Sequence, residues 1–270
     1  MAHYSLPRSM IENTVIQTLM DHRSIRRFTD QTPSEEIVDT IIRAGQQAPF
    51  ATQCYSLLLS RRRDRNPWRA PLLFTVCVDS HKFELIMAER QWRMVMNDLG
   101  FLLLAVQDAS FMSQNMVVAG RSLGLGSCFL GGTYYRADRI AEEYELPLRV
   151  LPIVQLAMGY PADSPPTRPR YPRDYTVFED RYPVLQKNLI HRAMDAMDRG
   201  YLDQEYYKNA NTKIPLTTGR PETYTFENYS WTEHISRKLG QWQQDPSEVI
   251  EQLRKRGFDI LPKKSADRSS

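Results

Sequence analysis

Apolar residues recur at helical spacing in three segments that each open with a helix-capping signal. Residues 9–20 begin with the Ser-x-x-Glu form of a capping box, and apolar side chains follow at every third or fourth position. The segments 32–45 and 245–253 each begin with a Thr or Asp followed by a proline, and an apolar stripe at helical spacing comes after it. The pattern therefore predicts two amphipathic helices early in the chain and one near its C-terminus.

Four short apolar runs have the length and composition of buried strands, and they occupy residues 55–59, 71–78, 127–130 and 150–158. Alternating with helical segments, they predict an α+β sandwich whose mixed central sheet is flanked by helices.

The segment Leu99–Gly120 contains a single charged residue, Asp108. Several amide and hydroxyl side chains interrupt it, and so many polar groups would be costly inside a bilayer. We therefore expect a long central helix that is buried on most of its circumference, either in a large core or at a dimer interface.

The charge balance is only mildly basic, with a formal net charge of +3 and a pI near 8.7. Without a recognisable binding module, this balance does not argue for nucleic acid as a partner. The run Arg61–Arg65 is most simply a solvated turn, and nucleic-acid binding through it is a minor alternative.

The three cysteines, Cys54, Cys77 and Cys128, are an odd number and have no Cys-x-x-Cys spacing. We interpret them as free thiols, two of them in apolar runs, and expect no zinc site. The segment Met1–Ser9 has no apolar core of the signal-peptide type, so the sequence predicts a cytoplasmic protein without a membrane span.

A basic loop follows the first predicted helix, at His22–Phe28. It places three guanidinium groups and one hydroxyl between Arg23 and Arg27. Planar guanidinium groups suit bidentate binding of phosphate, so the loop could act as a phosphate clamp. From these residues alone, a solvated basic turn is an equally good interpretation.

The loop resembles the opening signature of the nitroreductase family of FMN-dependent oxidoreductases. Two further segments resemble the family in the same order: the glycine-containing block Ser122–Gly132 and the closing block Gly159–Pro172, which contains Arg-Pro-Arg. Together the blocks span about residues 13–182. The resemblance implies the nitroreductase-like sandwich, with the central helix at a homodimer interface and FMN bound between both subunits.

The resemblance also implies a set of cofactor-binding residues. Basic side chains at both ends of the core would hold the phosphate and the N1/O2 edge of the flavin, and the glycine pair would let the main chain approach N5. A partial match adds one glutamine at the pyrimidine edge. No catalytic side chain and no metal ligand are implied. The predicted residues are His22, Arg23, Ser24, Ile25, Arg26, Gln53, Phe129, Leu130, Gly131, Gly132, Arg168 and Arg170.

The implied activity is FMN-dependent NAD(P)H oxidoreduction of nitroaromatics, quinones or flavins by ping-pong hydride transfer. The stretch Trp231–Ile235 is similar to the NADPH-preferring, oxygen-insensitive nitroreductase and flavin reductase branch, in which Arg220 would bind the NADPH 2′-phosphate. NADH is the other candidate donor. Phe50 and the short segment 60–71 depart from the family pattern, and they favour the alternative of a flavin-binding or redox-sensing module without turnover.

For the domain organisation, we expect an FMN-binding core at residues 9–185. A C-terminal helical extension would follow at 186–262, packed on the core or on the partner subunit, and a disordered tail at 263–270.

Overall fold

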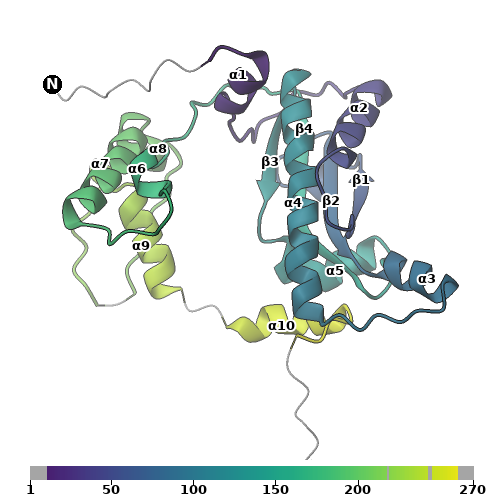
Figure 1. Cartoon of the computed structure of the whole chain (residues 1–270). Helices are drawn as coiled ribbons and strands as arrows, with labels where there is room; N and C mark the ends of the chain where they lie inside the picture. The colour runs from purple at the N-terminus through teal and green to yellow at the C-terminus, as the bar shows by residue number, and fades with distance from the viewer. Residues whose placement is uncertain (1–10, 218, 243–244, 261–270) are drawn as a thin grey trace, which may run out of the picture. The chain divides into compact units, whose positions relative to one another are not determined.

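The computed structural model describes residues 11–217, 219–242 and 245–260, and it divides the chain into two units (Figure 1). Unit 1 consists of the chain up to Pro165 together with the part from Pro246 onward, and unit 2 is Pro166–Asp245. The expected boundary after residue 185 falls inside unit 2, whereas the last helix returns to unit 1. The expected tail at 263–270 lies outside the described residues.

In its described residues, unit 1 contains four strands, two 3-10 turns and most of the helices. Its elements are α1 (Thr14–Met20), α2 (Glu35–Gln46), β1 (Tyr55–Ser60), η1 (Arg63–Arg65), β2 (Leu72–Asp79), α3 (His81–Glu89), α4 (Asp98–Ser122), β3 (Gly126–Leu130), η2 (Thr133–Arg136), α5 (Ala137–Glu143), β4 (Val150–Gly159) and α10 (Pro246–Lys255).

The four strands form one sheet in the order β1-β2-β4-β3, and each neighbouring pair is antiparallel. The prediction of a mixed sheet is wrong, because the only parallel pairing in the described residues is an isolated bridge between Ser24 and Ser127. Continuous apolar runs are typical of parallel strands covered on both faces. Here the sheet is also covered on both faces, although its strands are antiparallel.

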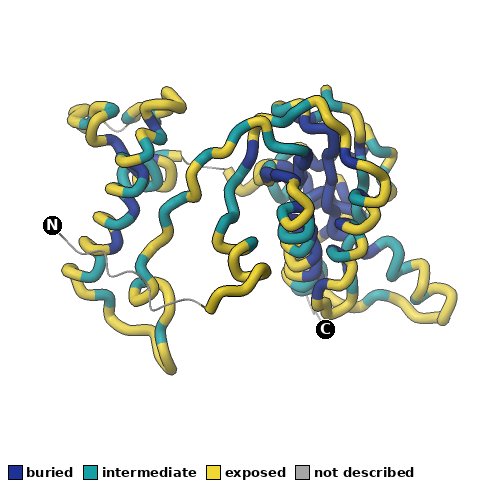
Figure 2. The backbone as a smooth tube through the Cα atoms, turned by 90° about the horizontal axis from the view of Figure 1, so that it is seen from above, coloured by how far each residue is buried: buried dark blue, intermediate teal, exposed yellow. Residues whose placement is uncertain are grey.

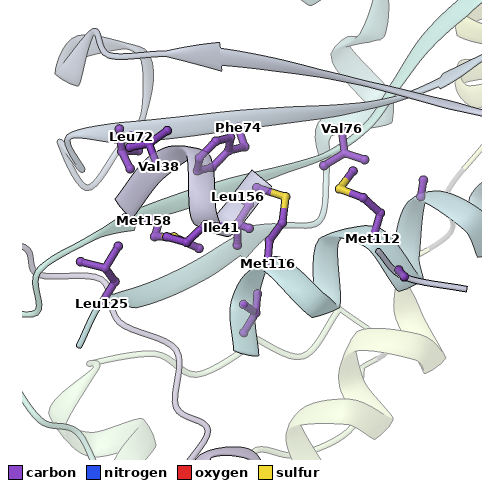
Figure 3. Packing of buried hydrophobic residues seen from close by; sticks show 13 residues of the cluster. Val38, Ile41, Leu72, Phe74, Val76, Met112, Met116, Leu125, Leu156 and Met158 are labelled. Carbon is purple, nitrogen blue, oxygen red and sulfur yellow. The ribbon is translucent and has the colours of Figure 1, made fainter. Parts of the chain in front are cut away.

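The main core lies between the sheet and the pair of helices α2 and α4. Figure 3 shows Phe74 of β2 and Leu156 of β4 in the same cluster as Ile41 of α2 and Met116 of α4. All four side chains are at most 1% exposed. Burial of these apolar side chains is the main stabilising contribution in unit 1. Figure 2 shows the backbone of the buried residues in dark blue.

The opposite face of the sheet carries a smaller cluster built from alternate strand positions. Leu73 of β2 and Ala157 of β4 are fully buried there against Trp68, Phe28 and Leu130. Because side chains alternate across a strand, neighbouring residues of β3 also divide between the two faces. Leu130 therefore faces this cluster, whereas Phe129 faces α4.

Helix α4 is the predicted central helix, and within one chain only one side of it is buried. One side packs against α2 and the sheet, and the other leaves apolar side chains exposed; these are Leu99, Leu103, Val106 and Phe111. Among the described residues, no helix is both long and apolar enough to cross a membrane.

The helix starts follow local capping oxygens. Helix α1 begins at Thr14, where the Asn13 side chain accepts a hydrogen bond from the backbone N–H of Val15 at 2.8 Å. The expected start at the 9–12 capping box is wrong, because residues 11–13 are not helical. Ser34 caps α2, and α10 begins at Pro246 as predicted.

Unit 2 contains α6 (Arg173–Thr176), α7 (Lys187–Asp203), α8 (Tyr206–Asn209) and α9 (Trp231–Gln241). Its core is built largely from tyrosines, among them Tyr201, Tyr207 and Tyr229. Beside them lies the buried Arg237, whose guanidinium binds the Glu222 and Glu233 carboxylates at 2.7 Å. This polar, aromatic core explains why the sequence of this region shows little apolar periodicity.

Candidate functional site

The basic arm, residues 22–28, extends the sheet beyond β3. The backbone N–H of Ile25 donates to the carbonyl of Ser127 at 2.9 Å, and Phe28 pairs with Pro161 after the end of β4. These main-chain bonds fix the arm beside the two segments that the sequence predicted to lie near a cofactor. The arm, β3 and the end of β4 therefore form one connected surface.

Close packing between Ile25 and Gly126 holds the arm in this position. Ile25 is 1% exposed, and a Cβ added to Gly126 would lie 2.8 Å from the Cβ of Ile25. A side chain larger than hydrogen does not fit there unless the arm moves. The Ile25 side chain therefore belongs to the core, and only its backbone is available for the predicted cofactor contact.

Arg23 uses most of its donors within unit 1. Its guanidinium is ion-paired with Asp21 and donates to Ser164 Oγ at 3.0 Å and to the Pro165 carbonyl at 3.2 Å. Asp21 is also ion-paired with Arg121 of α4. Arg23 thus fastens the arm to the segment after β4, and its phosphate contact stays a prediction.

Arg26 and Ser24 lie beside the thiol of Cys128 on β3. Burial raises the pKa of the Cys128 thiol, against the opposing effect of the Arg26 charge and of hydrogen bonds from Ser24 and Arg26. The Arg26 guanidinium carbon lies 5.8 Å from the ring centre of Trp68, and the residue as a whole is exposed. Arg26 is therefore the arginine of the arm that is both held near β3 and open to a ligand.

The turn after β3 is open where the glycine pair lies. A Cβ added to Gly131 or Gly132 would meet no atom within 4 Å. The packing of the protein itself therefore does not require glycine here, in contrast to Gly126. Main chain without a side chain at an open position is compatible with the close approach of a flat ligand, and the flavin contact of Gly131 and Gly132 stays a prediction.

A large apolar hollow lies next to this turn, on the α4 face of the sheet. Its volume of about 710 Å³ is within the range of ligand-binding pockets. Aromatic and aliphatic side chains from α4, β3, β4 and α10 line it, with a few polar groups. The lining includes Val106, Phe111, Phe129, Tyr134, Ile153 and Leu253.

The loop that carries Gln53 is held by Asp108 of α4, the single charged residue between Leu99 and Gly120. The buried carboxylate accepts backbone N–H groups from Ala51 at 2.8 Å, Thr52 at 3.0 Å and Cys54 at 3.3 Å. Burial tends to raise the pKa of Asp108, but these backbone donors outweigh it and lower the pKa. This role was not predicted, although a single charged residue in the apolar segment Leu99–Gly120 was the available signal.

Gln53 itself has a left-handed backbone, with φ of 55°. It lines a different hollow, of about 320 Å³, together with Tyr55 of β1 and Lys82 of α3. The structure of one chain therefore does not bring Gln53 to the hollow beside Phe129.

Arg168 and Arg170 belong to unit 2, and both make contacts there. Arg168 donates to Gln204 Oε1 at 2.7 Å, and its guanidinium carbon lies 4.1 Å from the ring centre of Tyr206. Arg170 donates to the carbonyls of Arg168 and Pro169 at 3.0 Å. Their predicted contact with the cofactor stays a prediction. Among the described residues, no group of three His, Cys, Asp or Glu side chains could hold a metal ion.

Known proteins that are similar to this chain over most of its length belong to the nitroreductase family. The model of the Nitroreductase family matches residues 56–160, which carry β1 to β4. An FMN reductase (NADPH) of Bacillus subtilis is 30% identical over 212 residues, covering 73% of this chain and 84% of the relative. An oxygen-insensitive NADPH nitroreductase of Salmonella typhimurium is 28% identical, covering 90% of this chain and 97% of the relative.

Solved structures agree with this assignment. NfrA2 of B. megaterium superposes with a TM-score of 0.78 at 26% identity, covering 93% of this chain and all of that one. The NfrA1 nitroreductase of B. subtilis gives a TM-score of 0.76 at 25% identity, covering 90% of this chain and 98% of that one. The sequence relatives and the fold together show that the chain belongs to the nitroreductase family.

Proposed function

We propose that this protein is an FMN-dependent NAD(P)H oxidoreductase that reduces nitroaromatics, quinones or flavins by ping-pong hydride transfer. The observation that carries this proposal is the open Gly131–Gly132 turn at the end of β3, the strand that pairs with the basic arm and contributes Phe129 to the apolar hollow. Similar proteins named as an FMN reductase (NADPH) and an oxygen-insensitive NADPH nitroreductase support it.

The residues of unit 1 fit FMN. Arg26 and Ser24 offer donors for phosphate and ribityl oxygens, and the main chain at 131–132 can approach a ring edge. The aromatic side chain of Phe129, 36% exposed, offers a flat apolar surface beside it. When bound, FMN supplies a ring system that accepts and returns a hydride.

The contribution of the chain to the reaction is to bind, orient and keep water out. The apolar lining beside Phe129 and Tyr134 limits water at the ring, and the cations of the arm favour negative charge on it. We assign no side chain a catalytic role, since water or the substrate can supply protons.

We place the dinucleotide preference in unit 2. Arg220 lines a hollow of about 430 Å³ together with Tyr224, Ser236 and Gln241. The Arg237 charge at this hollow is already paired with Glu222 and Glu233, so Arg220 is the cation left for a 2′-phosphate. This supports NADPH as the preferred donor, with NADH as the second.

We further propose that the protein is a homodimer and that it acts in the cytoplasm. The exposed apolar residues of α4 offer a surface for a second copy, and the three cysteines are free thiols. Because Gln53 lines a separate hollow in its own chain, its proposed flavin contact is made to the FMN of the partner. The C-terminal extension would pack on the core or on that partner. Size-exclusion chromatography with light scattering should give twice the chain mass of 31.5 kDa.

The second candidate function is a flavin-binding module without turnover. The exposed Phe50 next to the Gln53 loop favours it, because a small polar residue is common there in the family. Steady-state oxidation of NADPH with a quinone or nitrofurazone separates the two. Sustained turnover supports the oxidoreductase, and bound FMN without turnover supports the module.

A further inference from the structure

A second hollow lies on the opposite face of β3 from the apolar one. It has a volume of about 250 Å³, and Leu130 and Gln155 of the sheet form part of its wall. Four arginines also line it: Arg62, Arg65, Arg136 and Arg139. Neither the proposed activity nor the proposed flavin contacts use these arginines.

Two of the four guanidinium charges are neutralised locally. Arg62 is ion-paired with Asp64 at 2.8 Å. Arg65 is ion-paired with Glu143 at 2.6 Å, and its guanidinium carbon lies 4.7 Å from the ring centre of Tyr144. Both carboxylates also line the hollow, so these two pairs add no net charge to it.

The other two charges are not compensated. In the part of the chain that the structure describes, neither the Arg136 nor the Arg139 guanidinium has an ion-pair partner or a hydrogen bond. The two residues stand at the junction of η2 and α5, three positions apart, a spacing that places side chains on the same face of a helix. The hollow therefore has a net charge of about two positive units on adjacent side chains.

We propose that this hollow is a second anion site, which binds the phosphoryl group of a small molecule. Two adjacent guanidinium groups supply two positive charges and planar donor forks, which match a doubly charged phosphoryl group better than a single carboxylate. On the other side of the hollow, the ion pair of Arg65 with Glu143 joins η1 to α5. The proposal does not depend on the oxidoreductase activity.

Isothermal titration calorimetry of the full-length protein with inorganic pyrophosphate tests the proposal, with bound flavin measured beforehand by absorbance. We expect one pyrophosphate per chain, bound without loss of flavin. The double variant Arg136→Gln/Arg139→Gln should weaken binding by about tenfold or more, equivalent to about 1.4 kcal/mol. Arg90→Gln/Arg93→Gln removes the same two charges from exposed positions elsewhere in unit 1 and should leave the affinity within about twofold.

Two further titrations identify the ligand chemistry. Malonate, a dicarboxylate, should bind at least about tenfold more weakly than pyrophosphate, because its carboxylates offer fewer acceptor oxygens than two phosphoryl groups. Adenosine diphosphate distinguishes the source: affinity higher than that of pyrophosphate assigns the hollow to a nucleotide, and equal or weaker affinity assigns it to free phosphates.

Three results would overturn the proposal. The first is no heat of binding to the unmodified protein, and the second is an equal loss of affinity in both double variants. The third is pyrophosphate binding only after the flavin has been removed, which would make the hollow part of the cofactor site. Thermal melting of each variant checks that it is folded.

Discussion

The carboxylate of Asp108, in the middle of the central helix, accepts a hydrogen bond from the backbone N–H of Ala51 at 2.8 Å. Fifty-seven positions separate the two residues in the sequence. The same carboxylate binds the N–H groups of Thr52 and Cys54, so a single side chain fixes the loop on both sides of Gln53. This loop is where we propose a contact with the flavin of the partner subunit.

Asp108→Asn should lower the free energy of unfolding by about 2–4 kcal/mol. The substitution replaces a charged acceptor with a neutral amide, and the amide nitrogen cannot accept hydrogen bonds from the backbone N–H groups of the loop. Urea denaturation measures the change. Asp39→Asn is the control, since its ion pair with Arg43 is exposed and should contribute less than about 0.5 kcal/mol. Equal losses of unfolding free energy in the two variants would show that the hydrogen bonds of Asp108 to the loop contribute no more than an exposed ion pair.

The Asp108 contribution should also depend on pH. Its pKa in the folded protein lies below the value of about 3.9 for an unfolded chain, so its stabilisation is complete above the unfolded pKa. It is lost as the pH falls through the lower folded pKa. The stability gap between the unmodified protein and Asp108→Asn should therefore narrow from about pH 5 to about pH 3. A gap that widens on acidification would contradict the assigned ionisation.

Gly126→Ala should destabilise unit 1 by about 1–3 kcal/mol, because the new methyl group would overlap Ile25 and displace the basic arm. Gly132→Ala is the matched control, since the space around Gly132 is open, and its stability should stay within about 0.5 kcal/mol. Thermal melting of both variants checks the difference. Similar melting temperatures would mean that the arm is not held by this contact.

Gly132→Ala should nevertheless weaken FMN binding by about tenfold, or about 1.4 kcal/mol, if the flavin edge approaches the main chain there. Fluorescence titration of flavin-free protein with FMN gives the affinity. Because this variant should hardly change the stability of the protein, a loss of FMN affinity reflects the contact between the main chain and FMN alone. Unchanged affinity would remove the glycine turn from the proposed site.

Unit 2 should depend on the buried Arg237. Replacing it with Met removes the ion-pair partner of Glu233 and leaves Glu222 with Lys213 alone, so unit 2 should be clearly destabilised. Hydrogen exchange should report faster opening of α9 with little change in the sheet of unit 1. Lys208→Gln, which removes an exposed ion pair with Glu205, should leave the exchange of α9 nearly unchanged.

Most elements of unit 1 were predictable because their apolar runs reflect burial directly. The run predicted at 150–158 is β4, Val150–Gly159, and the run predicted at 55–59 is β1, Tyr55–Ser60. Helix α3 was not predicted, because none of its residues is buried and its sequence therefore lacks a clear apolar face. A helical extension was expected at residues 186–262, but the bounds of α7, α8 and α9 were not predicted, since tyrosines form their core.

Residues of the candidate site could be predicted only where they lie in a short segment whose sequence resembles the family. The order of the arm, the glycine pair and the Arg-Pro-Arg segment could be read from the sequence. The contact of Asp108 with the Gln53 loop joins distant positions, and so does the ion pair of Arg65 with Glu143. Neither leaves a local pattern. Whether Arg168 and Arg170 reach the flavin is likewise decided by tertiary arrangement.

The most direct test of the proposed function is an anaerobic titration of the purified protein with NADPH, followed by absorbance at the flavin bands. We predict that the protein is yellow as purified and that one NADPH bleaches each bound FMN, with NADH acting more slowly. A protein that carries FMN but keeps its flavin absorbance with both nicotinamides, or that carries no FMN, would contradict the assignment.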